Sequence, residues 1–232
     1  MARRRRAISV AGRSTIASGR PCGASLRVLP RSRGKTYLAA PPRDPEELRR
    51  FPHSILRAGK EVHRIHSVGL AAWYFGADDA WRFNPCAVPN LGACYLAERA
   101  VAGLLETYKG VTVVAEEDLA VKAHFTATLE RDVRLANCCV RAAGAFGVNG
   151  EIHTTSDYAL TQAWAGALAS AGFEGIRYFC RSDPAMGLVG YALFDTAGVA
   201  PPGRWPAGRG APVDENIVRE VEEYGLRVRP TP

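Results

Sequence analysis

The segments WRFNPC (residues 81–86) and CYLAERAVAGLLETY (residues 94–108) carry the strongest structural signal in this 232-residue chain. The apolar run ACYLA predicts a short buried strand, and it leads directly into a helix expected over residues 97–109. That helix is expected to bury one stripe of side chains, formed by Ala97, Val101, Leu104 and Tyr108. A strand that runs straight into a helix fixes the direction of both elements, so the rest of the fold can be assembled around this pair.

Two charged residues of these segments do not fit an apolar setting. Arg82 lies between Trp81 and Phe83, and its guanidinium cannot give up its charge. Glu106 lies off the apolar stripe of the helix, on the face that carries Ala102 and Gly103. One interpretation is a solvated surface glutamate. The other is that the small neighbours leave room for a ligand beside the carboxylate.

Arg64 is a third charged residue of this kind, within the alternating segment KEVHRIHSV (residues 60–68), which predicts a strand. Arg64 and Arg82 near a strand and a Gly/Pro-rich loop suit a pyrophosphate, because guanidinium groups bind phosphate oxygens in pairs. Each arginine could equally form a structural ion pair. From these residues alone, we expect an anion-binding domain.

The remaining patterns predict interleaved strands and helices. Further strands are expected at residues 110–115, 124–129, 175–180 and 187–194, and further helices at residues 45–51, after the Thr-Thr-Ser-Asp cluster that ends at Asp157, and near the C-terminus. The spacing lacks the regular alternation of a doubly wound sheet, and no GxGxxG follows a strand. The sequence therefore predicts an α+β fold with a mixed or antiparallel sheet and packed helices.

Charge divides the chain unevenly. Eleven basic residues and no acidic residue precede Asp44, so residues 1–43 contribute +11 and leave −4 for the rest of a net charge of +7. We predict that residues 1–43 are a basic, disordered extension. A nucleic-acid-binding arm and a transit peptide are the less favoured alternatives. Residues 199–232 are predicted to be a Pro/Gly linker and a terminal helix.

Several classes of protein are disfavoured by what the sequence lacks. Its longest apolar runs, such as GLVGYALF (residues 187–194), are too short to cross a bilayer, and no secretory signal is seen. The six cysteines form no CxxC pair, which indicates reduced thiols in a cytoplasmic protein. His63 and His66 lack a third ligand, so no metal site is expected. Neither GxSxG nor a catalytic cysteine motif supports acyl transfer.

Taken in order, five segments resemble the RES domain family of bacterial toxins. They are HRIH, RFNP, GACYLAERAVAGLLE, DYALTQAWAGAL with GFEGIRYFCRSDP, and YALFD, which together span roughly residues 53–195. The resemblance implies a fold similar to ADP-ribosyltransferases and makes residues 44–198 an NAD-binding catalytic domain. It also implies cleavage of the nicotinamide–ribose bond of NAD, with ADP-ribose passed to water, to inorganic phosphate or to a protein.

The resemblance assigns roles to individual residues. Arg64 and Arg82 would grip the phosphates of NAD, and Tyr95 would orient its ribose or nicotinamide. Glu106 would stabilise the positive transition state, because a carboxylate is worth more there than in the ground state. Cys180 stands where many relatives have serine, and a thiol is the poorer hydrogen-bond donor. Three nearby hydroxyl groups could compensate, and they belong to Thr155, Ser156 and Ser182.

The family also implies a partner, a helical antitoxin whose chain end blocks the NAD pocket. The sequence does not establish whether the protein forms a homo-oligomer. It also does not identify the group that accepts ADP-ribose. Two other functions remain alternatives to NAD glycohydrolase or phosphorylase activity. One is protein mono-ADP-ribosylation, and the other is a catalytically degenerate module that binds a nucleotide or the antitoxin, to which the Cys180 departure points.

Overall fold

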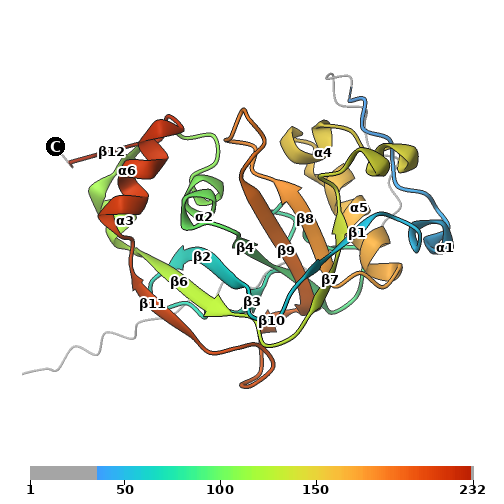
Figure 1. Ribbon diagram of the computed structural model, residues 1–232, viewed down its shortest axis with the longest axis horizontal. Helices are drawn as coiled ribbons and strands as arrows, with labels where there is room; N and C mark the ends of the chain where they lie inside the picture. Colours follow the sequence, from blue (N-terminus) through green and yellow to red (C-terminus); the bar gives the residue numbers. More distant parts are fainter. Residues whose placement is uncertain (1–35, 231–232) are drawn as a thin grey trace, which may run out of the picture.

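The computed structural model describes residues 36–230, which form a bent sheet with helices packed against it (Figure 1). The main sheet holds eight strands in the order β1 (His53–Leu56), β7 (Val133–Asn137), β8 (Gly175–Phe179), β9 (Val189–Thr196), β4 (Leu91–Ala97), β2 (Glu61–Ser67), β6 (Lys122–Thr128) and β11 (Gly208–Pro212). Neighbours are antiparallel except β7 and β8, so the sheet is mixed. The predicted α+β class is confirmed.

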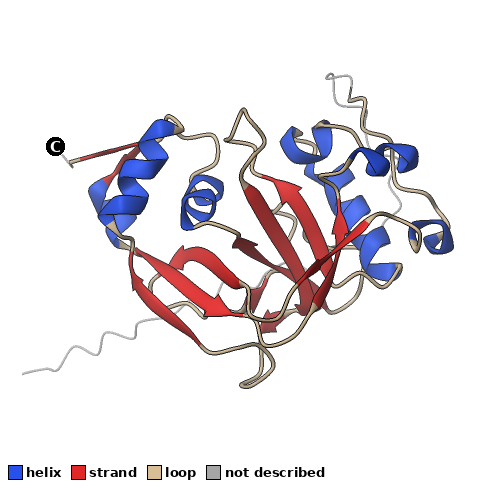
Figure 2. Cartoon of the chain, viewed as in Figure 1, coloured by secondary structure: helices blue, strands red, loops and turns tan. Residues whose placement is uncertain are grey.

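Helices gather in two groups on the sheet (Figure 2). One group covers the half that contains β8, and it comprises α1 (Pro45–Leu48), the 3₁₀ helix η1 (Arg141–Phe146), α4 (Glu151–Thr154) and α5 (Tyr158–Ser170). The other lies over the half that contains β2, and it comprises α2 (Ala100–Thr107), α3 (Glu116–Ala120) and α6 (Glu215–Glu223). Two small sheets complete the fold, β3 (Tyr74–Phe75) with β10 (Gly198–Val199), and β5 (Val113–Ala115) with β12 (Arg227–Arg229).

The sheet opens between its two halves, at the junction of β4 and β2. β4 pairs with β9 over seven positions, yet it pairs with β2 at a single position, His63 with Ala97. On its other side β2 pairs with β6 over seven positions. The two halves are therefore each well bonded and meet at one point, from which the strands splay apart.

The predicted strand and helix at residues 94–108 form β4 and α2, and α2 lies beside the splayed strands. Val101 and Leu104 of α2 are fully buried, together with Val221 of α6, in one of three apolar clusters. Under the other half of the sheet, Trp164 and Leu168 of α5 fill a second cluster. The apolar stripe predicted for α2 is thus its core-facing side.

Several segments differ from the sequence-based expectations. Residues 36–39 belong to the predicted disordered extension, but Leu38 is buried and the Ala39 carbonyl accepts a hydrogen bond from Trp164 Nε1 (2.8 Å). Residues 1–35 lie outside the described residues. The predicted linker contributes β11, because its backbone finds the free edge of β6. β7 was not expected, and neither were the short strands β1, β3, β10 and β12.

Among the helices of residues 36–230, none has both the length and the apolar character needed to span a membrane.

Gly92 allows the backbone of residues 75–76 to cross closely over β4. An added Cβ at Gly92 would lie 2.7 Å from the Phe75 carbonyl carbon and 2.9 Å from the Gly76 carbonyl oxygen. Gly92→Ala is therefore expected to lower the free energy of unfolding by about 1–3 kcal/mol, as overpacking does. The measurement is urea denaturation, with Gly210→Ala as control because a Cβ there has no neighbour within 4 Å. Equal stability of the two variants would contradict the close crossing.

Candidate active site

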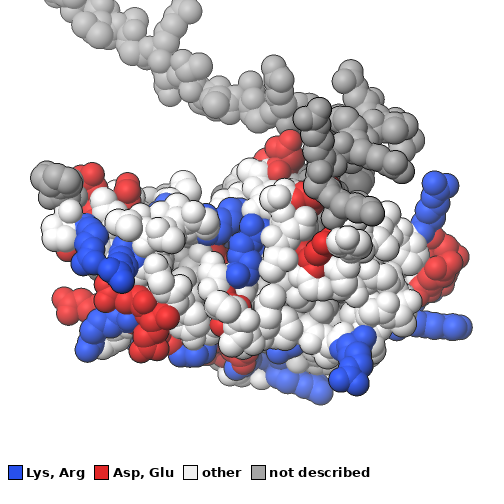
Figure 3. All heavy atoms as spheres, turned by 90° about the horizontal axis from the view of Figure 1, so that it is seen from above, with Lys and Arg blue, Asp and Glu red and all other residues white. Residues whose placement is uncertain are grey.

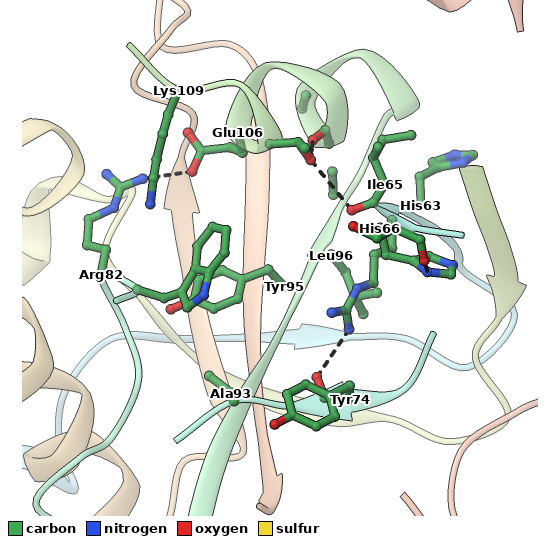
Figure 4. A pocket seen from close by; sticks show the side chains of 18 of the residues that line it. His63, Ile65, His66, Tyr74, Arg82, Ala93, Tyr95, Leu96, Glu106 and Lys109 are labelled. Carbon is green, nitrogen blue, oxygen red and sulfur yellow. Dashed lines mark hydrogen bonds and ion pairs between the residues drawn. The ribbon is translucent and has the colours of Figure 1, made fainter. Parts of the chain in front are cut away.

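A cavity of about 290 Å³ lies where β2 and β4 diverge, with α2 along one wall (Figure 4). Its lining includes Arg64, Arg82, Tyr95 and Glu106, so the structure brings together four of the residues selected from the sequence. They come from four separate elements: β2, the loop before β4, β4 itself and α2. The cavity exists because the two strands pair at one position only, which leaves their side chains to line a hollow.

Glu106 faces this cavity from α2. Its side chain is 19% exposed, so the solvated-surface interpretation does not hold. Ala102 and Gly103 also line the cavity, and a Cβ at Gly103 would lie 3.5 Å from the Ile65 side chain. The small residues on this face of α2 therefore let the helix approach β2 and leave the carboxylate free to point inward.

Two hydrogen bonds orient the Glu106 carboxylate. Arg82 Nη2 donates to Oε2 at 2.8 Å, and the backbone N–H of Arg181 donates to Oε1 at 3.2 Å. The Cys180 thiol also interacts with the carboxylate, and its pKa is raised to about 12 by burial and, secondly, by the Glu106 charge. Each of the two carboxylate oxygens thus accepts a hydrogen bond.

Arg82 is 4% exposed and is held between aromatic rings. Its guanidinium lies 5.2 Å from the centre of the Phe83 ring and 5.1 Å from that of Tyr178. Among the described residues, the buried Nη1 atom has no hydrogen-bond partner. Because Nη2 is committed to Glu106, Arg82 acts first as the counterion of that carboxylate, which explains why a guanidinium is needed between two aromatic residues.

Buried polar side chains hold the loop that carries Arg82. Asn84 Nδ2 donates to the Asp78 carbonyl (2.8 Å), and Gln162 Nε2 on α5 donates to the Asp79 and Trp81 carbonyls (both 2.9 Å). These side chains satisfy loop carbonyl groups that no strand reaches. The loop therefore behaves as part of the core, and it positions Arg82 accurately.

The hydroxyl group of Tyr95 forms hydrogen bonds with the same loop. The oxygen accepts the Phe83 backbone N–H (2.8 Å) and donates to Asn84 Oδ1 (3.0 Å), and burial raises the pKa of Tyr95. Its ring lies 5.7 Å from the Trp81 ring, measured between centroids. The ring, not the hydroxyl, is thus the part of Tyr95 available to a ligand.

Arg64 on β2 is anchored at one edge. Its Nη1 donates to the carbonyls of Ala72 (2.6 Å) and Tyr74 (3.2 Å) and contacts the Cys94 sulfur. Nε and Nη2 have no hydrogen-bond partner within residues 36–230. One edge of the guanidinium is therefore fixed, and the other can bind an anion in the cavity.

Two predicted ligand-binding residues lie outside this lining. Ser156 is exposed before α5, where Asp157 has taken the N-cap position by accepting the Leu160 N–H (3.3 Å). Cys180 is fully buried behind Glu106. Contact of either residue with a ligand stays a prediction, and the Cys180 thiol contacts the Glu106 carboxylate.

Lys109 and Lys122 also line the cavity, and neither was predicted from the sequence. Lys109 Nζ lies 4.2 Å from the centre of the Trp81 ring. Lys122 begins β6 and shares its polar face with His124 and Thr126, an alternation that the sequence does display. What the sequence does not display is the register that places this face beside β2.

The surface seen in Figure 3 is not dominated by charge of one sign. The face seen in Figure 3 carries basic and acidic side chains interspersed, without a broad field of one sign. His63 Nδ1 and His124 Nε2 lie 3.1 Å apart, and burial lowers the pKa of both. In the part of the chain that the structure describes, no cluster of histidine, cysteine and carboxylate side chains is suited to hold a metal ion.

The pH dependence of stability tests the burial of His153 near the Arg82 charge. Burial and, secondly, the Arg82 charge lower the pKa of His153 to about 4. In an unfolded chain histidine binds its proton near pH 6.5, so the stability due to neutral His153 is complete above that pH and is lost as pH falls toward 4. Between pH 6.5 and pH 4 we expect the free energy of unfolding of the wild type to fall by up to about 3 kcal/mol relative to that of His153→Gln. Urea denaturation at a series of pH values measures this difference. Equal pH dependence of the free energy of unfolding in the wild type and in His153→Gln would contradict this prediction.

Comparisons with known proteins agree with the fold. The model of the RES domain family matches residues 61–207, well over half of the chain. Among solved structures, the chain is similar to one in the crystal structure of the M. tuberculosis MbcT–MbcA toxin–antitoxin complex, with a TM-score of 0.55 and 19% identity. The alignment covers 77% of this chain and 95% of that one, and it shows a shared fold. A search of curated proteins gave no match. On the extent of the family match, this chain belongs to the RES domain family.

Proposed function

We propose that this chain is the toxin of a toxin–antitoxin pair and that it cleaves the nicotinamide–ribose bond of NAD. The observation that carries the proposal is a carboxylate, Glu106, held from two sides on the wall of a cavity whose other charged residues are mostly cations. Membership of the RES family supports it, as does a similar fold in a toxin–antitoxin complex. A fold similar to ADP-ribosyltransferases remains part of this proposal.

The chemistry fits an ionised, oriented carboxylate. When the bond between C1′ and the nicotinamide nitrogen breaks, both electrons go to the nitrogen and nicotinamide leaves neutral, so positive charge develops at C1′. A carboxylate facing C1′ stabilises that charge more than it stabilises bound NAD, which lowers the barrier. Arg82 and the Arg181 N–H fix Glu106 before the reaction, so the group does not have to reorganise.

Aromatic rings beside the carboxylate suit the leaving group. Trp81 and Tyr95 both line the cavity with their rings 5.7 Å apart, and Tyr178 lines it near Arg82. A flat nicotinamide ring can stack on such surfaces, and a cationic one gains a further attraction to the π face. Trp81 is 39% exposed, so it stands at the entrance.

ADP-ribose then passes to an oxygen nucleophile, for which we propose water or inorganic phosphate. Lys109 lies beside the entrance without a carboxylate partner within 4 Å among residues 36–230, as suits an anionic acceptor. The antitoxin is the proposed partner, and the expected place for its blocking segment is the mouth of this cavity. Transfer to a protein and a purely nucleotide-binding role are the competing functions.

Glu106→Gln is expected to reduce NAD cleavage by about 10²–10³-fold, since it removes the charge but keeps the shape. The measurement is nicotinamide release by purified protein, with and without inorganic phosphate, and the mass of the ADP-ribosyl product identifies the acceptor. Glu117→Gln is the matched control, because Glu117 is exposed on α3. Cleavage by Glu106→Gln at the control rate would overturn the proposed role. Absence of turnover in wild type that still binds nucleotide would favour the binding module.

A further inference from the structure

The turn between β8 and β9 carries a backbone group that binds Glu106. It comprises residues 180–188 and extends beyond the sheet beside α2 (Figure 1). Its first two residues supply the Glu106 carboxylate with the Arg181 N–H, at 3.2 Å, and with the Cys180 thiol. The shape of this turn therefore determines where these two partners of the carboxylate lie.

The Asp183 carboxylate holds the turn from within. Asp183 is 4% exposed, and its two oxygens accept hydrogen bonds from three backbone N–H groups. Oδ1 accepts from Ala185 at 3.0 Å, and Oδ2 accepts from Gly187 at 2.6 Å and from Leu188 at 2.8 Å. Burial alone would raise the pKa of Asp183, but the three hydrogen bonds outweigh burial and the pKa is lowered. An ionised side chain at the centre of the turn thus binds N–H groups that would otherwise lack partners.

Two further features indicate that the turn has one defined conformation. The Cys180 N–H donates to the Leu188 carbonyl at 2.8 Å, which closes the turn at its base. Met186 has a φ of 52°, in the left-handed region that residues other than glycine rarely adopt. Such a conformation persists only where the surrounding structure fixes it, and the hydrogen bonds of Asp183 lie on both sides of Met186. Asp183 therefore determines the shape of the turn.

We propose that Asp183 is a positioning residue for the reaction at Glu106, and that it acts through this turn and the Arg181 N–H. The inference rests on the proposed function, in which the Glu106 carboxylate faces the reacting ribose. Asp183 does not belong to the lining of the cavity. Arg82 holds Oε2 of Glu106, so the Arg181 N–H is what prevents the carboxylate from turning about that one bond. A small displacement of a group that acts on the reacting atom lowers the rate steeply.

The first experiment measures nicotinamide release from NAD by Asp183→Asn. The amide presents an NH₂ group to the backbone N–H groups, so at least one of the three hydrogen bonds is lost. We expect kcat to fall by roughly tenfold to a hundredfold with an unchanged KM for NAD, because the lost interaction acts in the transition state. Because Asp183 acts through Glu106, the same substitution is expected to cause no further loss in Glu106→Gln.

Asp195→Asn is the matched control, at the far end of β9. The Asp195 side chain is 9% exposed, and its carboxylate accepts hydrogen bonds from the Thr196 N–H at 2.8 Å and from Trp205 Nε1 at 2.7 Å. Asp195→Asn is expected to lower the free energy of unfolding and to keep the kcat of the wild type. Urea denaturation of each variant establishes that it is folded under the conditions of the assay.

The second experiment does not depend on NAD cleavage. It follows the amide proton of Arg181 by NMR, with Glu106→Ala as the reference in which the hydrogen bond to the carboxylate is absent. In Asp183→Asn this resonance is expected to move toward its position in Glu106→Ala, and in Asp195→Asn it is expected to stay in place. In the wild type, the Arg181 amide is expected to exchange with solvent deuterium at the same opening free energy as the amides of Gly187 and Leu188, because the turn opens as one unit.

Three kinetic results would overturn the positioning role: an unchanged kcat in Asp183→Asn, an equal loss in Asp195→Asn, or an equal further loss when Glu106 is already Gln. An unmoved Arg181 resonance in Asp183→Asn would also overturn it. If Asp183→Asn does not fold, amide exchange in the wild type decides, and an Arg181 amide that opens more easily than those of Gly187 and Leu188 removes the proposal.

The two proposals fail separately. Absence of NAD cleavage in the wild type removes the proposed reaction, and the Arg181 resonance then decides whether Asp183 positions the group that holds Glu106. NAD cleavage with the same kcat in the wild type and in Asp183→Asn leaves the reaction standing and removes the positioning role.

Discussion

The single pairing between β2 and β4 is the constraint on which the rest of this molecule depends. Seven paired positions hold β4 to β9 and seven hold β2 to β6, so each half of the sheet is rigid. Between them only His63 and Ala97 are in register, and the strands diverge from there. In a continuous sheet, backbone hydrogen bonds would join β2 and β4 along their length and close this gap. The opening turns them into the walls of a cavity.

The short connection between β4 and α2 then places Glu106 at this cavity. Because β4 leads into α2 within three residues, the helix must lie beside the opening that β4 borders. Its apolar stripe faces the core shared with α6, and its small-residue face is left toward the cavity with Glu106. The position of the carboxylate thus follows from local sequence, once the strands have separated.

The buried pair of Arg82 and Glu106 is better explained by function than by stability. Removing two charges from water costs several kcal/mol, and an apolar pair of similar volume often stabilises a protein equally well. Here the arginine is held between rings, the loop is held by Asn84 and Gln162, and the carboxylate receives a second hydrogen bond from the backbone of Arg181. Such support fixes one orientation of Glu106, which is what stabilisation of a developing charge requires.

Sequence patterns predicted the elements that are local and missed those that depend on distant pairing. The strand and helix at residues 94–108, the helix capped by Asp157 and the apolar stripe of α2 follow from short-range periodicity, and they are present. β11 has a Gly/Pro composition typical of a linker, and it becomes a strand only because β6 offers a free edge. Lys122 was missed for the same reason, since its place opposite Ser67 of β2 is set by strand register. The solvent-facing position of Ser156 likewise depends on the N-cap chosen by α5.

The most direct test of the account is a crystal structure of Glu106→Gln with intact NAD bound. The account predicts that C1′ of the nicotinamide ribose faces residue 106, with the nicotinamide near Trp81 and Tyr95 and a phosphate beside Arg64. A dinucleotide bound with its nicotinamide end away from residue 106, or bound outside the cavity between β2 and β4, would contradict it.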